Sequence, residues 1–341
     1  MKIILIFISI IAILCSGCRP LVKENPESAA KFNSPAAINY NKNHYPVTIE
    51  NINYRTEREV FTYKKPPERV VAVWQNSIET LLALGVGDRI IAAMGVPDKK
   101  YFRSEYQKQY EKIPYTSFEL LSIEEVLMLQ PDLIVGWHST FGDKVLRGTD
   151  FWRSRNVNTY MTPSSVPGKK EKLLEDEYQD ILNMGKIFDK NEKAQQIVSQ
   201  MRNEIQFVQN NTHNLKERPK GIIIEFLGKD ITVYNEKTLA GNIFKSLNGE
   251  LLAPKENKIG IEQLVDLNPD AIFVVIIESA YGREQDFLNR IYENTALSHL
   301  KCVREKRVYP LPLYAIYSSG VRTYDGIQIM AHGLYPELYK E

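Results

Sequence analysis

The sequence feature that most constrains the fold is an internal repeat. Residues 122–137 (SIEEVLMLQPDLIVGW) align without a gap with residues 260–275 (GIEQLVDLNPDAIFVV). Each copy predicts a short helix that stops at Gln or Asn before a proline and is followed at once by a buried strand. Because this helix-to-strand unit occurs twice, far apart in the chain, it predicts two α/β lobes of similar design.

The segments around the repeat also alternate between strand and helix. Short apolar or β-rich runs bounded by turn or polar residues are typical of buried parallel strands. Between the first two runs lies an apolar segment with helical spacing, which Gly85 or Gly87 would end. The predicted fold class is therefore α/β, and each lobe has a small, mainly parallel sheet flanked by helices. The predicted strands are residues 69–74, 89–95, 132–137, 158–163, 220–227, 270–276 and 306–312.

One long backbone helix is predicted to join the two lobes. Asp189 and Glu192 have the spacing of a capping box, so we expect this helical tract to break near Gly185 and to restart. Ahead of the first strand, residues 47–63 alternate apolar and polar side chains around a turn, which predicts a short edge hairpin. The predicted N-terminal lobe, connecting helix and C-terminal lobe are residues 46–172, 173–212 and 213–341.

The N-terminus has the pattern of a secretory signal. Its apolar run, residues 3–14, is too short to span a bilayer but matches the core of a signal peptide. Ser and Gly directly before Cys18 resemble a bacterial lipobox, although Cys15 stands where Leu is usual. We therefore predict a signal peptide over residues 1–18 with acylation of Cys18; the alternative is an ordinary cleaved signal. The polar residues 19–45 are expected to form a flexible tether.

Cysteine content and net charge narrow the classes of protein that fit. Removal of the signal leaves Cys18 and Cys302, so the mature domain cannot hold a disulfide framework and must rely on an apolar core. Lys and Arg total 43 against 42 for Asp and Glu, so no global electrostatic field favours nucleic acid. The partners must therefore be recognised at local sites.

Each copy of the repeat carries a glutamate seven residues before its proline, Glu124 in the first and Glu262 in the second. Ser122 and Gly260 are the predicted N-caps, so both carboxylates fall in a first helical turn, where the helix dipole favours them. The dipole alone could account for either glutamate. Their matching positions in two lobes favour a pair of exposed acidic sites suited to arginines of a membrane protein.

From about Val47 onward the sequence resembles the periplasmic binding proteins that serve siderophore, haem and cobalamin importers. The likeness rests on PPERVVAVWQNSIETLLALGVGDRIIAAMG, on both glutamate repeats, on the long helical tract, and on VREKRVYPLPLY with the terminal LYPELY. It implies two α/β lobes at the ends of a rigid helix, with the ligand in the cleft between them. It also implies that Glu124 and Glu262 dock on arginine pockets of the permease.

The resemblance further implies that segments leaving the carboxyl ends of strands line the cleft, where open parallel sheets generally bind ligands. Aromatic side chains there would stack on a macrocycle or a catecholate ring, and arginines would neutralise the anionic groups of a ferric chelate. Ordinary packing remains the alternative for any single residue. The candidate ligand-binding residues are Trp74, Gln75, Trp137, His138, Phe226, Tyr234, Tyr281, Arg283, Tyr314, Tyr317 and Arg322.

One of these candidates, His138, could contact iron directly because an imidazole directly after a strand can ligate the metal of haem or of a ferric siderophore. Tyr281, Tyr314 and Tyr317 are equal candidates, since phenolates also bind haem iron. The five histidines stand far apart, so neither a dedicated protein metal site nor an intrinsic cofactor is expected.

The resemblance implies a receptor and not an enzyme. The expected function is to capture a ferric siderophore or haem and deliver it to the permease dimer with its ATPase; a corrinoid such as cobalamin is the alternative ligand. The expected protein is a monomer, extracytoplasmic and anchored to the membrane through acylated Cys18. A secreted enzyme or an adhesive lipoprotein is less favoured. For the enzyme, the sequence has no GxSxG, P-loop or HExxH motif.

Overall fold

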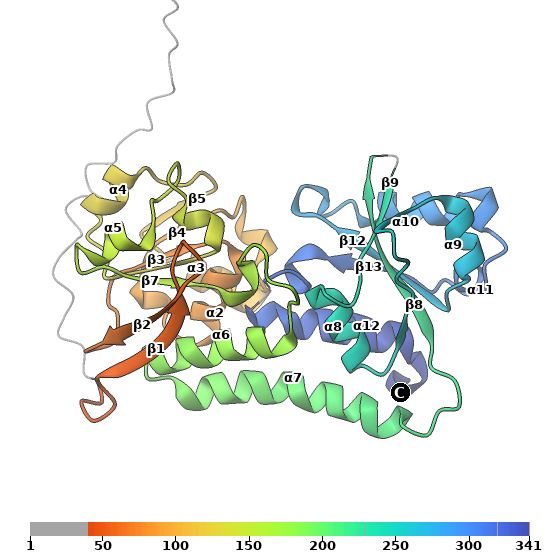
Figure 1. Cartoon of the computed structure of the whole chain (residues 1–341), viewed down its shortest axis with the longest axis horizontal. Coiled ribbons are helices and arrows are strands. Elements are labelled where there is room, and N and C mark those ends of the chain that lie inside the picture. The colour runs from red at the N-terminus through yellow and green to blue at the C-terminus, as the bar shows by residue number, and fades with distance from the viewer. Residues whose placement is uncertain (1–39, 229, 319, 341) are drawn as a thin grey trace, which may run out of the picture. The chain divides into compact units, whose positions relative to one another are not determined.

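The computed structural model describes residues 40–228, 230–318 and 320–340. These residues belong to one unit of the chain, Asn39–Glu341, which is treated by itself below (Figure 1). The predicted signal peptide, the acylated Cys18 and most of the predicted tether lie outside the described residues. The first described elements are the strands β1 (Val47–Ile52) and β2 (Arg58–Tyr63), which pair antiparallel as the predicted hairpin.

The first sheet consists of five parallel strands in the order β5–β4–β3–β6–β7. Every residue of its central strands β3, β4 and β6 is buried, which is why their sequences are continuous apolar runs. Four of the strands were predicted, whereas β5 is a short, largely exposed edge strand with no apolar run to mark it. The bounds are β3 Val70–Val73, β4 Ile90–Met94, β5 Tyr115–Ser117, β6 Leu133–Gly136 and β7 Asn158–Met161.

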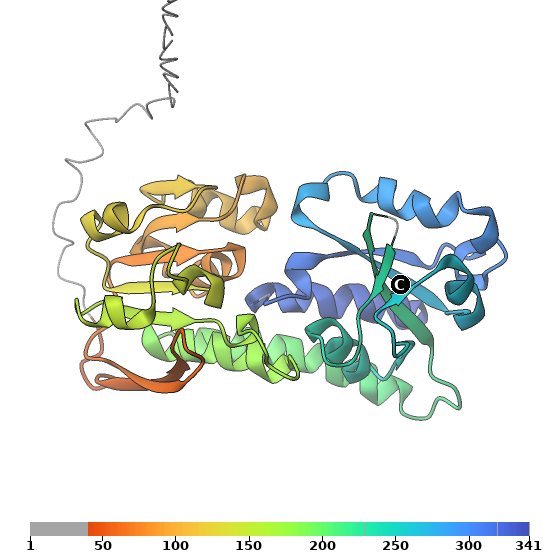
Figure 2. The same cartoon turned by 45° about the horizontal axis from the view of Figure 1, so that its top comes forward.

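The second sheet is mainly parallel, with an antiparallel edge. Its order is β11–β9–β8–β12–β13, and β10 also pairs with β8. Strands β8, β12 and β13 are parallel, whereas β9 and β11 run antiparallel to their neighbours. The bounds are β8 Lys220–Leu227, β9 Asp230–Val233, β10 Glu250–Leu251, β11 Lys258–Ile259, β12 Ala271–Ile276 and β13 Val308–Pro312. Figure 2 shows the two sheets side by side in separate lobes, each with its own helices.

Both copies of the repeat form the predicted helix and strand. Helix α4 (Ile123–Met128) leads into β6, and α9 (Ile261–Leu267) leads into β12. Gln130 and Asn268 hold equivalent places before the prolines, and both adopt left-handed backbone, with φ of 48° and 43°. A residue before proline avoids right-handed helix, so the two helices end where the sequence predicts.

The predicted helical tract forms two helices, α6 (Leu174–Ile187) and α7 (Asn191–Thr212), which lie side by side in Figures 1 and 2. The break between them was predicted, but the capping box of Asp189 and Glu192 was wrong. Asp189 has left-handed backbone with φ of 54°, and its carboxylate lies 3.3 Å from His44 Nδ1. Helix α7 therefore begins without a side-chain cap.

One apolar core continues beneath both sheets. Val70 and Ala72 of β3 and Phe273 and Val275 of β12 belong to it, while the alternate residues of each strand face a separate outer layer, as the two-residue period of strands requires. Free Cys302 is buried in the outer layer of the second sheet. The remaining helices are α2 Gln75–Ala83, α3 Ser104–Tyr110, α5 Thr149–Arg153, α8 Leu239–Ser246, α10 Glu284–Tyr292, α11 Lys301–Arg304 and α12 Thr323–Leu334.

The chain after β13 returns to the N-terminal part of the unit. A 3-10 turn, Gly320–Arg322, packs on α2 and α6, and α12 then packs on α7 and α8. The predicted fold class, two α/β lobes with small sheets joined through a long helix, is confirmed, with the helix divided into α6 and α7. The precise residue boundaries of the lobes stay a prediction.

Candidate functional site

A cavity of about 570 Å³ lies where segments from both sheets meet. Its walls come mainly from residues in the segments that follow β3, β4, β5 and β6 in the first sheet and β12 and β13 in the second. The carboxyl ends of parallel strands thus converge on one space, the position at which open α/β sheets generally bind ligands.

The wall from the first sheet is built on two stacked indoles. The rings of Trp74 and Trp137 lie 5.1 Å apart with an interplanar angle of 23°. Trp74 Nε1 donates to Thr140 Oγ1 at 3.0 Å, and Trp137 Nε1 donates to Asn76 Oδ1 at 2.7 Å. Because both indole N–H groups are already bonded within the protein, these rings offer their faces and edges to a ligand and no free donor.

Gly95 makes this wall possible. Its backbone is left-handed with φ of 88°, and a Cβ at this position would lie 2.6 Å from Cε3 of the Trp74 ring. The ring of Trp74 therefore lies directly against the backbone at the end of β4, which only glycine permits without displacement.

The wall from the second sheet includes Tyr314 and Tyr317, and Tyr281 contacts Tyr314 from outside the lining. Tyr281 stands between Tyr101 and Tyr314, with ring centroids 5.3 Å from each. Burial raises the pKa of Tyr281 and of Tyr314 above the usual phenol value. Both side chains are consequently neutral phenols at physiological pH.

Arg322 lines the cavity and is already paired with carboxylates. Its side chain is 7% exposed, its Nε lies 2.9 Å from Asp325 Oδ2, and Glu79 Oε2 is 3.6 Å away. The guanidinium also lies over the ring of Tyr314, 4.0 Å from its centroid. Arg103 pairs with the same Asp325 and donates its backbone N–H to Glu79 Oε1 at 2.9 Å. Two carboxylates and two guanidinium groups thus balance one another.

Six of the eleven predicted ligand-binding residues line this cavity. Tyr281 is not among them, although it contacts Tyr314, which is. The structure therefore brings together the residues predicted directly after β3, β6 and β13. The six are Trp74, Gln75, Trp137, Tyr314, Tyr317 and Arg322.

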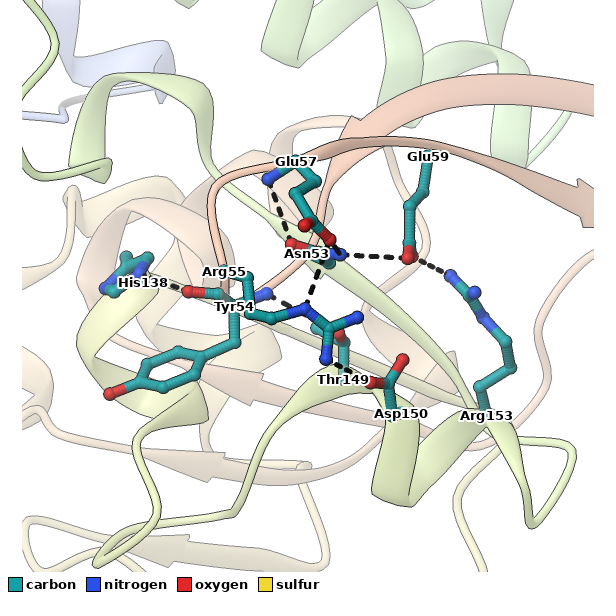
Figure 3. Close-up of polar contacts among 9 residues, drawn as sticks. All are labelled: Asn53, Tyr54, Arg55, Glu57, Glu59, His138, Thr149, Asp150 and Arg153. Carbon is teal, nitrogen blue, oxygen red and sulfur yellow. Dashed lines mark hydrogen bonds and ion pairs between the residues drawn. The ribbon is translucent and has the colours of Figure 1, made fainter.

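His138 follows Trp137 directly but does not line the cavity. Its Nε2 lies 2.9 Å from the carbonyl oxygen of Tyr54, and the His138 and Tyr54 rings stack at 4.7 Å. Figure 3 shows this pair at the turn of the β1–β2 hairpin, which Arg55 also ties to α5 through Asp150 at 2.9 Å. The imidazole thus holds the hairpin turn.

Three further predicted residues also lie outside the cavity lining. Phe226 is buried in the outer core of the second sheet, with the guanidinium of Arg290 3.9 Å from its ring centroid. Tyr234 donates its hydroxyl hydrogen to Glu225 Oε2 at 2.7 Å. Arg283 is exposed at the start of α10. The predicted arginines therefore supply no unpaired cation to the cavity. Arg283 does not line it, and Arg322 is already neutralised by its carboxylates.

Several lining residues were not predicted. Tyr101 and Phe118 contribute aromatic surface, and Glu278 contributes a carboxylate. The signal for Glu278 was available, since it comes two residues after the predicted strand that ends at Ile276, and the rule that ligands bind at carboxyl ends of strands covers it. Phe118 directly follows β5, but this exposed edge strand was not predicted, so the rule could not identify it. Tyr101 lies farther along its loop, where no such rule identifies a residue.

The two repeat glutamates are exposed, each in the first turn of its helix, Glu124 in α4 and Glu262 in α9. Helices α4 and α9 lie at opposite sides of the unit in both views (Figures 1 and 2). The N-cap of α4 is Ser122, whose Oγ accepts from Glu125 N at 3.2 Å, whereas Gly260 has no side chain to cap α9. Neither glutamate forms an ion pair with another described residue.

Within the part of the chain that the structure describes, no helix is both long and apolar enough to cross a membrane. Among the same residues, no three His, Cys, Asp or Glu side chains gather in a group that could hold a metal ion.

Known proteins resemble this chain over most of its length. The sequence model described as "Periplasmic binding protein" matches residues 70–315. The crystal structure of a periplasmic binding protein from Veillonella parvula DSM 2008 is 41% identical, with a TM-score of 0.86, over 90% of this chain and 97% of that chain. The uncharacterized ABC transporter substrate-binding lipoprotein YvrC of Bacillus subtilis (strain 168) is 24% identical over 87% of this chain and 88% of YvrC. The petrobactin-binding protein YclQ of the same organism is 23% identical over 79% of this chain and 82% of YclQ.

The two-lobed α/β fold, with a cavity at the carboxyl ends of strands from both sheets, defines a class of binding proteins. Since the family match covers most of the sequence, the chain belongs to the periplasmic binding protein family.

Proposed function

We propose that this chain is the substrate-binding component of an ABC importer and that it carries an iron chelate, a ferric siderophore or haem, in the cavity described above. The observation that carries the proposal is the stacked pair of Trp74 and Trp137, facing Tyr314 and Tyr317 from the other sheet. Aromatic walls of this kind suit a flat or bulky chelate whose outer surface is organic. YclQ, a relative of similar length, is named for binding petrobactin.

A corrinoid such as cobalamin is the second candidate ligand. It is favoured by the charge balance at Arg322, because a ligand without excess negative charge needs no unpaired arginine. In either case the bound molecule is cargo, and the chemistry of the protein is recognition and release.

Tryptophan fluorescence tests the cavity. The chain has three tryptophans, and Trp152 is fully buried in the outer core of the first sheet, away from the cavity lining. We expect haemin, a ferric siderophore or cyanocobalamin to quench the emission in a saturable titration. The quenching should persist in Trp152→Phe and fall in the double variant Trp74→Phe and Trp137→Phe. An absence of saturable quenching by all three ligands would overturn the proposal.

We also propose that Glu124 and Glu262 dock the protein on the permease. Both carboxylates are exposed on helices of different lobes, where arginines of a membrane protein can reach them. Changing both to Ala should abolish transport in reconstituted vesicles or cells while ligand affinity stays unchanged. Asp266→Ala, at an exposed position of the same helix α9, is the matched control and should transport normally. Equal loss of binding and transport in the glutamate variants would contradict a docking role.

The remaining proposals concern the N-terminus and the assembly. We propose that acylated Cys18 anchors an extracytoplasmic monomer to the membrane. Changing Cys18 to Ala should release the protein from the membrane fraction and abolish incorporation of labelled fatty acid. Fractionation after signal processing measures both outcomes, and an unaltered membrane association would exclude the anchor.

A further inference from the structure

We infer that the cavity selects a chelate of small net charge, such as an uncharged ferric trihydroxamate or an uncharged corrinoid, and discriminates against polyanionic ferric chelates. This inference rests on the proposed function and concerns the charge of the ligand that the same cavity takes. It comes from the charges of the lining residues and of the groups that contact them.

Among the described residues of the lining, one side chain is cationic, Arg322, and that cation is already neutralised. Asp325 and Glu79 lie within 3.6 Å of its Nε, and its plane lies against Tyr314. To serve as counter-ion for a ligand, the guanidinium would have to leave two carboxylates, one of them, Glu79, fully buried. A buried acid left without its cation is strongly unfavourable, so Arg322 stays with its partners.

The other charged lining residue is an anion, Glu278. It is exposed on the turn after β12, and no cation among the described residues forms an ion pair with it. A polyanionic ligand in the cavity would therefore meet a like charge, which is unfavourable at short range even when solvent screens it.

Two lysines outside the lining lie over the rings of aromatic lining residues. Lys172 Nζ lies 4.1 Å from the ring centroid of Tyr317, and Lys100 Nζ lies 5.3 Å from that of Tyr101. Counted together with Glu278, these two cations give a formal charge of only +1 near the lining. That is too little to balance a trianion and is compatible with a neutral or singly charged ligand.

The remaining polar lining groups are uncharged, and one of them has an unused donor. Asn76 is 5% exposed, and its Oδ1 accepts from Trp137 Nε1 at 2.7 Å, which fixes the orientation of the amide. The Nδ2 of Asn76 has no hydrogen-bond partner among the described residues. Asn76 therefore adds a neutral polar group and no charge to the lining.

Titration with ligands of different charge tests the inference. The probes are ferrichrome and cyanocobalamin, both uncharged, and ferric enterobactin, a trianionic tris-catecholate, each added to the purified mature protein. We expect at least one uncharged probe to bind on the order of 100-fold more tightly than the trianion. Its Kd should change less than about twofold between low and high salt, because no net ligand charge is screened.

A variant at Glu278 sharpens the test. Glu278→Gln should raise the affinity for the trianionic probe, relative to the affinity for the uncharged probes, by about fivefold to tenfold. Glu293→Gln, at an exposed position outside the cavity lining, is the matched control and should change neither affinity.

The outcomes separate this inference from the proposed function. If ferric enterobactin binds as tightly as the uncharged probes, or if Glu278→Gln leaves its affinity unchanged, the charge selection is wrong and the receptor function stands. If neither these probes nor haemin binds, the receptor function fails and the charge selection fails with it.

Discussion

Residues 318 and 320–325 contact two buried acidic sites, one on α2 and the other on α6. At the first, Glu79 of α2 faces Arg322 and accepts hydrogen bonds from Gln75 and from the backbone of Arg103. At the second, Glu177 of α6 accepts a hydrogen bond from the backbone N–H of Gly320 at 2.7 Å. The same segment of chain is therefore held by an ion network on one helix and by carboxyl hydrogen bonds on the next.

The two sites differ in how the burial of negative charge is offset. Burial raises the pKa of Glu79, and nearby Arg322 opposes that rise. Asp180, one turn after Glu177, has burial as the main cause of its shift and the charge of Glu177 as the next, so its pKa rises from 3.8 to about 8. Cations therefore balance the negative charge of Glu79 at the first site, whereas Asp180 at the second site keeps its proton at neutral pH. Neighbouring contacts of one segment can therefore depend on different quantities: the contact at Glu79 on a nearby cation, and the contact at Glu177 on pH.

Removal of the cation from the first site should have the largest effect. Arg322→Met leaves Glu79 buried without its main counter-charge, so the free energy of unfolding should fall by about 3–5 kcal/mol. Urea denaturation followed by circular dichroism measures this loss. Arg283→Met, at an exposed arginine, is the control and should change stability by less than about 0.5 kcal/mol. A loss below about 1 kcal/mol in Arg322→Met would show that the network does not offset the burial of Glu79.

The second site should give a pH dependence of stability. The folded protein keeps a proton on Asp180 up to a pH of about 8, while the unfolded chain loses it near its usual pKa of 3.8. The stability from this group is thus fully present below the lower value and is lost as the pH rises through the upper one. One proton corresponds to about 1.4 kcal/mol per pH unit, or about 3 kcal/mol between pH 5 and pH 7.

The matched variant for this prediction is Asp180→Asn, which cannot lose a proton. Its stability should fall less steeply between pH 5 and pH 7 than that of the unmodified protein, because the titration of Asp180 is absent while the raised pKa of Glu79 remains. Both proteins are measured by urea denaturation at each pH. Identical slopes would mean that Asp180 is ionised in the folded protein.

Replacement of Glu177 should have a smaller effect on stability and should also change its dependence on pH. Ser164 Oγ and Gly320 N both donate to its carboxylate. Glu177→Gln keeps one acceptor oxygen but loses the other, so stability should fall by about 2 kcal/mol. Removal of the negative charge should also lower the pKa of Asp180, which moves the upper end of its pH window downward. A variant with lower stability and an unchanged pH profile would contradict the coupling of the two carboxyls.

The repeat and the central strands were predictable from the sequence because their signals are local. Buried parallel strands such as β3 and β12 are continuous apolar runs, and the ends of α4 and α9 are marked by the residues before Pro131 and Pro269. The position of the cavity at strand ends was predictable for the same reason. Its residues Trp74 and Trp137 directly follow strands, and the rule that ligands bind at carboxyl ends of strands identifies them.

The direction of a side chain and its distant partners were not predictable. His138 and Trp137 are adjacent, and only Trp137 lines the cavity, because the imidazole is held at the Tyr54 carbonyl on the hairpin. Arg322 and Glu79 are far apart in the chain, so the sequence indicates neither their contact nor the loss of Arg322 as a free cation. Such pairs depend on tertiary packing, which no local pattern encodes.

The smallest expected effect is at Gly320, where the segment turns between its two acidic sites. The backbone there is left-handed with φ of 54°, and a Cβ would lie 2.4 Å from Thr80 Oγ1 of α2. Gly320→Ala should therefore lower the free energy of unfolding by about 1 kcal/mol. In the double variant with Thr80→Ala the clash is removed and the backbone strain remains, so a double-mutant cycle should show a favourable coupling of about 0.5 kcal/mol. Additive losses would mean that the turn shifts away from α2, and ligand affinity would then fall as well, because Tyr317 and Arg322 would move with it.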